Sequence, residues 1–249
     1  MKNRSTLRAL IALAALGSSA SAFAGTFVAY GDVHDGGKLL GETGAFRDGT
    51  GGEFKVVVQT GWLGVTGLAA DAIGAGERSQ TFQTFCIETD EFVDLGGTTY
   101  HGTINTIANF GGANTDQGDP IDARTAFLYT AFRHGTLQGY NYASGAGREA
   151  SAVALQQAFW FIEGESGGAN NAFVALANAA VAPGGSWHTQ WGPNSIGNVR
   201  ALNNVQRNAN GVVIDDTVQD FLTLIPLPGA TGMALAGLAV VGTRRTRTL

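Results

Sequence analysis

Cysteine is almost absent from this chain: Cys86 is the only one among its 249 residues. A single cysteine excludes an intramolecular disulfide and any zinc site built from several thiolates. The four histidines, His34, His101, His134 and His188, are scattered and form no His-x-x-x-His pair. We therefore expect neither a metal site nor a cofactor.

Positive charge is also scarce. The region from residue 25 to residue 224 contains nine basic and 20 acidic residues, a net charge of −11, against −5 for the whole chain. This balance argues against binding to nucleic acid. Charged residues make up only 14% of the chain, whereas 44% of residues are hydrophobic and 37 are glycine. Such a composition favours a single folded, turn-rich domain over residues 25–224 rather than a disordered chain.

The first 24 residues have the three parts of a secretory signal peptide. Lys2, Arg4 and Arg8 form a basic start, residues 9–16 are an unbroken apolar run, and Ala22-Phe23-Ala24 supplies a small-x-small pattern. The apolar run is too short to span a membrane. We therefore expect export, with cleavage after residue 24.

The C-terminal end has the layout of a short membrane anchor. Residues 221–243 contain no charge, and Arg244, Arg245 and Arg247 follow at the terminus. Residues 229–242 are small and weakly apolar, so a span of roughly 20 residues has to include residues 225–228 as well. The terminal arginines favour a cytoplasmic location for this end. A helix this marginal is better suited to temporary than to permanent anchoring.

Residues 225–249 resemble a PEP-CTERM sorting signal, the substrate of exosortase in Gram-negative bacteria. The resemblance rests on Pro226-Leu227-Pro228, the small-residue apolar stretch and the terminal arginines. In that family a glutamate stands at the position of Leu227, so the resemblance does not define the processing point. It implies transient insertion into the inner membrane, processing by an exosortase-type enzyme, and display at the cell surface or in the extracellular matrix. A plain C-terminal membrane helix is the alternative.

Alternation of apolar and polar residues predicts strands at both ends of the domain. A short strand lies near Phe27, and residues 52–62 alternate most clearly. Residues 81–92 form another, with Phe85 and Ile87 on one face and Cys86 on the other, and residues 98–104 are expected to pair with it. Near the C-terminus, residues 198–205 and 212–224 predict a hairpin with a type I′ turn at Asn210-Gly211.

Helical periodicity occupies the middle of the domain, at about residues 120–181. It predicts helices over residues 120–133, 148–163 and 170–181, followed by a loop with two tryptophans over residues 184–197. The predicted fold class is therefore α+β: an antiparallel sheet or sandwich built from both ends of the core, with a central block of about three helices.

Two short segments resemble the thioester domains of bacterial surface adhesins. In that family an aromatic-Cys-aliphatic strand is joined to a Thr-Gln-x-Ala-aliphatic-Trp helix. The segments here are Phe85-Cys86-Ile87-Glu88 and Leu155-Gln156-Gln157-Ala158-Phe159-Trp160. Leu155 replaces the family's threonine and Phe159 its aliphatic residue. The residues that match beside the cysteine and the glutamine are Phe85, Ile87, Ala158 and Trp160.

The resemblance implies that Cys86 is the thiol and Gln156 the acyl donor of an internal thioester. Such a bond forms when the thiolate attacks the side-chain amide and ammonia leaves, which requires the two groups to be held close together. The activated acyl group then couples to an amine of a partner, on an extracellular protein or polysaccharide. A lone cysteine in an exported chain is consistent with this chemistry.

An ordinary structural interpretation stands beside this one. A cysteine between two apolar residues is a common buried residue, because cysteine is among the most buried residue types. In the same way, the segment around Gln156 is compatible with an amphipathic helix that packs Phe159 and Trp160 into a core.

Other motifs point to weaker candidates. Residues 164–168 have the letters of a Gly-x-Ser-x-Gly nucleophile elbow, but a helix rather than a strand precedes them, so we expect a loop between helices. Asp116, Asp119 and Asp122 lack the spacing of a calcium loop and are better explained as a solvated helix start. A peptidase built on Cys86 and His134 would lack an orienting third group.

Two classes of function remain compatible with the sequence. The first is a structural or adhesive surface protein, with or without the Cys86–Gln156 thioester. The second is a secreted hydrolytic enzyme whose active site the sequence does not locate. The absence of a convincing acid–base or metal constellation favours the first, so we expect that the protein is not an enzyme.

Overall fold

The computed structural model describes residues 24–31, 52–60, 81–94, 98–109, 118–143 and 145–225. Most of the predicted signal peptide lies outside these ranges. The predicted sorting residues also lie outside them: Pro226, Leu227, Pro228, Arg244, Arg245 and Arg247.

A six-stranded antiparallel sheet combines strands from both ends of the domain, in the order β3-β2-β1-β4-β7-β8. Strands β4 and β7 are neighbours in the sheet, and their pairing joins the N-terminal part of the domain to its C-terminal part. The bounds are Ala24–Gly31 for β1, Phe54–Thr60 for β2, Thr81–Thr84 for β3, Thr99–Asn105 for β4, Val199–Arg207 for β7 and Val213–Leu224 for β8. A small second sheet pairs β5 (Ile107–Ala108) with β6 (Asp119–Pro120).

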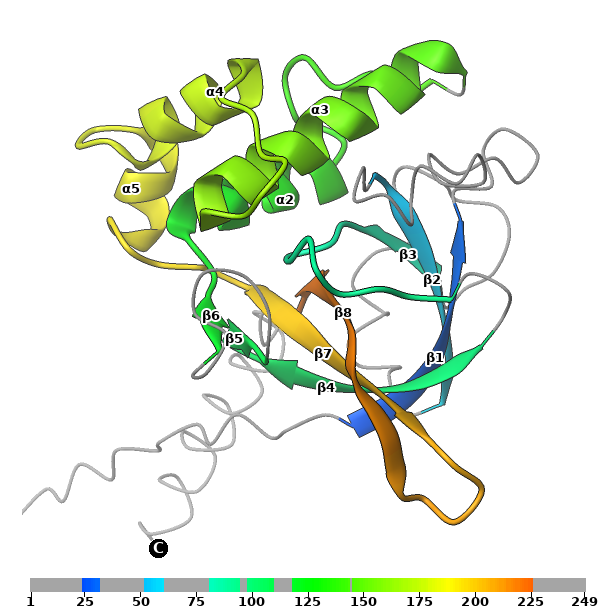
Figure 1. The fold of residues 1–249 in the computed structure, drawn as a ribbon. Coiled ribbons are helices and arrows are strands. Elements are labelled where there is room, and N and C mark those ends of the chain that lie inside the picture. Colours follow the sequence, from blue (N-terminus) through cyan, green and yellow to red (C-terminus); the bar gives the residue numbers. More distant parts are fainter. Residues whose placement is uncertain are drawn as a thin grey trace, which may run out of the picture.

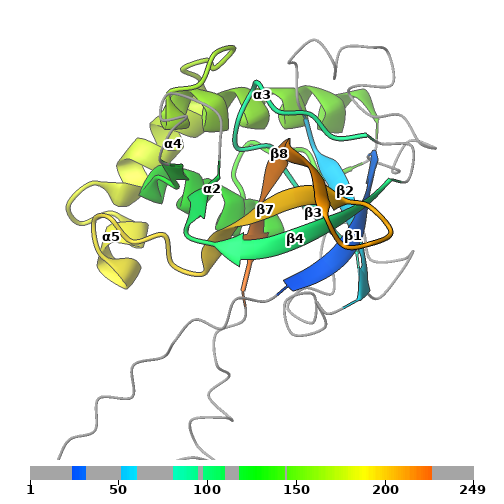
Figure 2. The same cartoon turned by 60° about the horizontal axis from the view of Figure 1, so that its bottom comes forward.

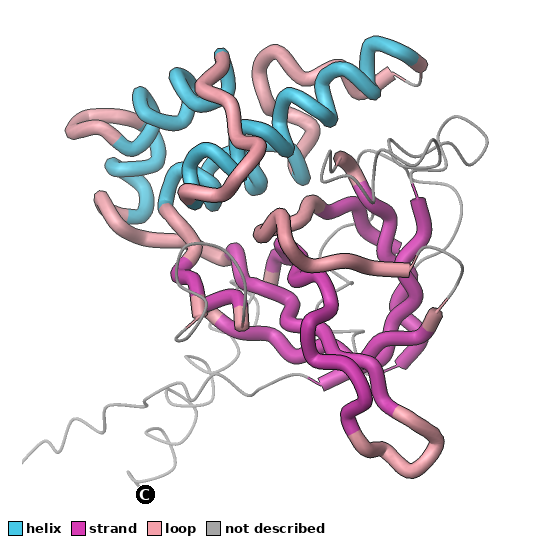
Figure 3. Tube along the Cα trace, viewed as in Figure 1, coloured by secondary structure: helices cyan, strands magenta, loops and turns pink. Residues whose placement is uncertain are grey.

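The helices gather on one side of the curled sheet, as two views of the ribbon show (Figures 1 and 2). They follow one another in the middle of the chain: α2 (Ala123–Arg133), α3 (Ala146–Glu163), α4 (Ala172–Val181) and α5 (Ser186–Trp191). Coloured by secondary structure, the chain separates into a helical part and a strand part (Figure 3). The predicted α+β class, with a central helical block and a sheet built from both ends, is confirmed.

Helix ends follow local capping chemistry. The Asp122 side chain accepts a hydrogen bond from the Arg124 N–H (2.7 Å) and caps α2. The predicted start at residue 120 was too early, because Pro120 pairs with Ile107 in the small sheet. At the C-terminal end of the next helix, α3, Gly164 adopts a left-handed conformation (φ 85°), which confirms the predicted helix stop.

A short helix, α5, replaces part of the loop predicted over residues 184–197. It begins after Gly185, and its Trp187 is buried against Trp191, with ring centroids 5.7 Å apart. The Trp187 indole also donates to the carbonyl of Ser195 (2.8 Å). Burial of aromatic surface therefore stabilises a helix in a segment that was predicted to be a loop.

Two strand predictions were wrong in detail. Residues 98–104 were expected to pair with residues 81–92, but β4 pairs with β1 and β7 instead. The turn between β7 and β8 is not of type I′, which requires positive φ at both central residues. Among the described residues only glycines have positive φ, and here that residue is Gly211. The connection is a longer turn, closed by hydrogen bonds between Asn208 and Val212 and between Gly211 and Asn208 (each 2.9 Å).

Buried side chains form two clusters. The helical core lies between the helices and the sheet, and its largest completely buried members are Phe85, Ile87, Leu128, Tyr129, Phe132, Leu155 and Phe159. The sheet core lies inside the curl of the sheet and consists of Phe54, Val56, Phe82, Cys86, Val93, Tyr100, Trp160, Leu202, Val218 and Phe221.

A buried ion pair joins the start of β2 to the first turn of α3. Arg148 binds both carboxylate oxygens of Glu53, one of them at 2.8 Å, and the Tyr140 hydroxyl donates to the same carboxylate (2.6 Å). The two charged side chains are 3% and 1% exposed. A pair so deeply buried tolerates the loss of neither partner, since the other charge would be left without compensation.

We expect Arg148→Met to lower the free energy of unfolding by about 3–5 kcal/mol, because it leaves the buried Glu53 carboxylate unpaired. The measurement is chemical denaturation of the variant and the parent protein. The matched control is Arg124→Met, which breaks the half-exposed pair with Asp122 (29% and 34% exposed) and should cost less than about 1 kcal/mol. Equal losses in the two variants would contradict the importance of the buried pair.

Candidate functional site

The two edge strands of the sheet meet at the segment that follows β3. The predicted strand over residues 81–92 leaves β2 after Thr84, and residues 85–92, which we call the seam segment, run along β8 instead. The Leu222 N–H donates to the Phe85 carbonyl (3.2 Å), and the Ile87 N–H donates to the Asp220 carbonyl (3.1 Å). These bonds close the curl of the sheet. They place Cys86 opposite Phe221 in the seam.

Side chains of the seam segment alternate between the two cores, as the sequence predicted. Phe85 packs edge-on against Phe132 and Phe159 in the helical core, with ring centroids 5.0 and 5.2 Å away. Ile87 belongs to the same core. Cys86 points the opposite way, into the sheet core, and is 2% exposed.

The Gln156 side chain completes the backbone pairing of Cys86. The hydrogen bonds between the seam segment and β8 are made by the neighbours of Cys86, Phe85 and Ile87. The N–H and C=O of Cys86 itself therefore face away from β8. Gln156 Oε1 accepts the Cys86 N–H (3.1 Å), and Gln156 Nε2 donates to the Cys86 carbonyl (2.9 Å). A primary amide is a donor and an acceptor at once, so it replaces a missing strand here. Gln156 itself is fully buried.

The rest of the α3 motif attaches to the same segment. Trp160, one helical turn after Gln156, donates from its indole nitrogen to the Glu88 carbonyl (3.2 Å). Ala158 has no exposed surface, in keeping with its place in the helical core. The structure therefore brings the two predicted motifs together through side-chain contacts at Gln156, Phe159 and Trp160.

The environment of Cys86 is unfavourable for a free thiolate. Burial raises the pKa of its thiol well above the ordinary value, and the nearby Glu88 and Glu91 carboxylates raise it further. The thiol is consequently a poor target for reagents in solution. What the arrangement does supply is proximity: a primary amide is held by two hydrogen bonds against the backbone of the cysteine.

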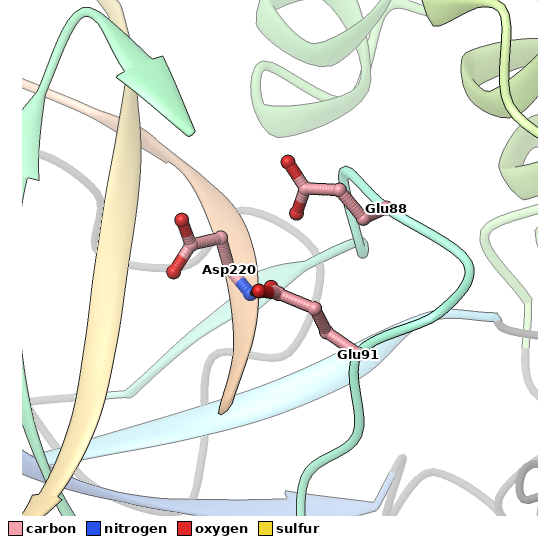
Figure 4. A group of neighbouring side chains, drawn as sticks. All are labelled: Glu88, Glu91 and Asp220. Carbon is pink, nitrogen blue, oxygen red and sulfur yellow. Dashed lines mark hydrogen bonds between the residues drawn. The ribbon is translucent and has the colours of Figure 1, made fainter. Parts of the chain in front are cut away.

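Three buried carboxylates lie close to the contact between Cys86 and Gln156. Glu88 and Glu91 come from the seam segment and Asp220 from β8 (Figure 4). One oxygen from each lies within 4.8 Å of the others, and the three residues are 0%, 5% and 1% exposed. Sequence reasoning missed this cluster because Asp220 is distant in sequence. The signal in the sequence that could have revealed the cluster was Asp220, an acidic residue next to apolar residues in the last strand.

Burial perturbs all three carboxyl groups. It raises the pKa of Glu88 to about 11 and that of Glu91 to about 9, with the Asp220 charge adding to both effects. It also raises the pKa of Asp220 to about 7, although hydrogen bonds from the N–H groups of Asn109 and Asn204 oppose the rise. Carboxylates this close need protons or a cation to offset their mutual repulsion at neutral pH.

Within the described residues, the weaker sequence candidates do not form the sites that their motifs suggested. Gly164 ends α3, and Ser166 is exposed in the loop between α3 and α4, as expected for a segment that is not a nucleophile elbow. Asp122 is a helix cap, which agrees with the helix-start interpretation, whereas Asp119 is buried in β6 rather than solvated and Asp116 lies outside the described residues. His134 is exposed at the end of α2, whereas Cys86 is buried, so no accessible Cys–His pair exists there.

Comparison with family models found no match, and comparisons with curated proteins and with solved structures found no similar protein. Among the residues that the structure describes, no helix has the length and apolar character needed to cross a membrane. The case for a function therefore rests on the geometry around Cys86.

We expect Gln156→Met, made in a Cys86→Ala background, to lower the free energy of unfolding by about 2–4 kcal/mol. The change leaves one buried N–H and one buried carbonyl unpaired, and each costs about 1–3 kcal/mol. The background excludes any covalent contribution from the sulfur. Denaturant unfolding is the measurement.

The control for that experiment is Gln157→Met, in the same background, at the neighbouring half-exposed glutamine. It should change the unfolding free energy by less than about 0.5 kcal/mol. A loss at position 156 no larger than at position 157 would show that the amide does not support the seam.

Proposed function

We propose that this chain is an exported cell-surface or extracellular-matrix protein with a structural or adhesive role, and that Cys86 and Gln156 form an internal thioester that couples to partner amines. The observation that carries the proposal is the pairing of the Gln156 amide with the backbone of Cys86, inside the domain and away from water. The lone cysteine and the lone buried glutamine of α3 thus meet at one point.

The bond-forming step is balanced without any further reagent. The Cys86 sulfur attacks the Gln156 side-chain carbonyl carbon, a sulfur–carbon bond forms, and the carbon–nitrogen bond of the amide breaks. The thiol proton leaves with the nitrogen as ammonia, so the new covalent bond replaces the hydrogen bond from Gln156 Nε2 to the Cys86 carbonyl. Because burial raises the thiol pKa, the reaction depends on the closeness of the two groups, which is worth many orders of magnitude in effective concentration.

Burial of Cys86 and Gln156 would also protect the proposed thioester from water. A thioester is hydrolysed by water, and the seam keeps both partners at 2% exposure or less. An amine of a partner protein or polysaccharide must reach the seam to attack, which releases the Cys86 thiol and leaves an amide on the Gln156 side chain. Each molecule therefore couples once, as an adhesive device does.

The purified exported protein should be lighter than its sequence mass by one ammonia, and methylamine should add to it. Cys86→Ala and Gln156→Met should each abolish the ammonia loss and the methylamine adduct, whereas Gln157→Met should retain both. Intact-mass spectrometry under denaturing, mildly acidic conditions makes the measurement. An unshifted mass together with one thiol that titrates after unfolding would overturn the thioester.

The sorting role of the tail is a separate part of the proposal. Deletion of residues 244–249 removes the terminal arginines, which should disturb the orientation of the anchor and its processing. We expect less protein in the extracellular fraction and more unprocessed chain. Fractionation and immunoblotting of the producing bacterium make the comparison, with the Cys86→Ala chain as a control that is sorted normally. Unchanged release of the truncated chain would contradict exosortase sorting.

A further inference from the structure

The carboxylate cluster beside the seam has features that a structural ion-pair network lacks. Among the described residues, no arginine or lysine forms an ion pair with Glu88, Glu91 or Asp220; the ion pairs of Arg124 and Arg148 lie elsewhere. Both carboxylate oxygens of Glu88 are buried and accept no hydrogen bond from an N–H or hydroxyl group of the described residues; only a proton on Glu88 itself could join it to Glu91. A buried carboxylate without such donors is costly as an anion, and a cation bound between the three groups would offset the charges of all of them at once.

The other two carboxylates are already held in place. Asp220 receives hydrogen bonds from the N–H groups of Asn109 and Asn204 (each 2.8 Å), one on each oxygen. Glu91 receives the Asp220 N–H on its Oε2 (3.1 Å). Such bonds orient carboxylates in the way that outer partners orient metal ligands. Each of these oxygens retains a lone pair for a cation.

We propose that Glu88, Glu91 and Asp220 bind one hard divalent cation, with a preference for Ca²⁺, and that this cation fixes the seam segment to β8. The three carboxylates offer only oxygen ligands, which hard cations prefer. Mg²⁺ usually keeps several waters and is bound through one or two carboxylates, whereas Ca²⁺ accepts a larger set of protein oxygens in a flexible geometry. The three oxygens lie within 4.8 Å of one another at a buried position, so a set of protein carboxylates rather than water surrounds the site, which favours Ca²⁺.

The position of the site gives the cation a structural consequence. Glu88 is two residues from Cys86, its carbonyl accepts the Trp160 indole N–H, and the Asp220 carbonyl accepts the Ile87 N–H. A bound cation would join the seam segment to β8 directly after the Cys86–Gln156 contact. The proposal goes beyond the thioester and does not depend on it, because the three ligands include neither of its partners.

The test titrates chelator-treated protein with Ca²⁺, Mg²⁺ and Mn²⁺ in a calorimeter and follows thermal unfolding in parallel. We expect one Ca²⁺ per chain, and a melting temperature that rises by about 5–10 °C at a hundredfold excess over the dissociation constant. Cys86→Ala should respond in the same way, so that failure of the thioester and failure of the cation site are distinguishable.

Glu88→Gln keeps the shape of the side chain and should weaken Ca²⁺ binding by more than about tenfold. It should not unfold the metal-free protein, because burial raises the pKa of Glu88 so far that its carboxyl is protonated there, and the amide is equally uncharged. The control, Asp216→Asn, replaces a carboxylate on the exposed part of β8 and should retain full binding. No binding of any of the three cations, or an equal loss in Asp216→Asn, would overturn the proposal. A stronger response to Mg²⁺ or Mn²⁺ would overturn the Ca²⁺ preference.

Discussion

The pairing of one side-chain amide with one backbone residue is the constraint on which the rest of this structure depends. The sheet curls until β3 and β8 are adjacent, and the seam segment that joins them has one free edge, at Cys86. Gln156 covers that edge with a donor and an acceptor. The same contact docks α3 on the sheet, so the helical and strand parts are joined where the cysteine is buried.

The seam concentrates both apolar packing and negative charge. Phe85 and Phe159 pack together on one side of it, and the carboxylates of Glu88, Glu91 and Asp220 gather at its end. Burial makes each carboxylate costly as an anion, yet all three are retained within one small volume. A cation there and a covalent bond at Cys86 would act in the same direction, because both would hold the seam closed against opening of the curl.

Much of the fold follows from local patterns, whereas the site depends on contacts distant in sequence. Alternation located β2 and β8, the apolar stripe of α3 is buried at Ala152, Leu155, Phe159 and Ile162, and Gly164 ends that helix. The two faces of the seam segment were also predicted correctly. Its change of partner from β2 to β8 was not, because no local pattern encodes which strand edge lies nearby. The carboxylate cluster was missed for the same reason, since Asp220 approaches Glu88 only after the curl closes.

The central claim, that Cys86 and Gln156 are covalently joined, is tested most directly by peptide mapping. Trypsin cleavage at the arginines places Cys86 in the peptide of residues 79–124 and Gln156 in that of residues 149–200. Digestion near neutral pH, followed at once by tandem mass spectrometry, should detect these two peptides as one cross-linked species lacking one ammonia. Recovery of the two peptides separately, with an intact thiol and an intact amide, would contradict the account.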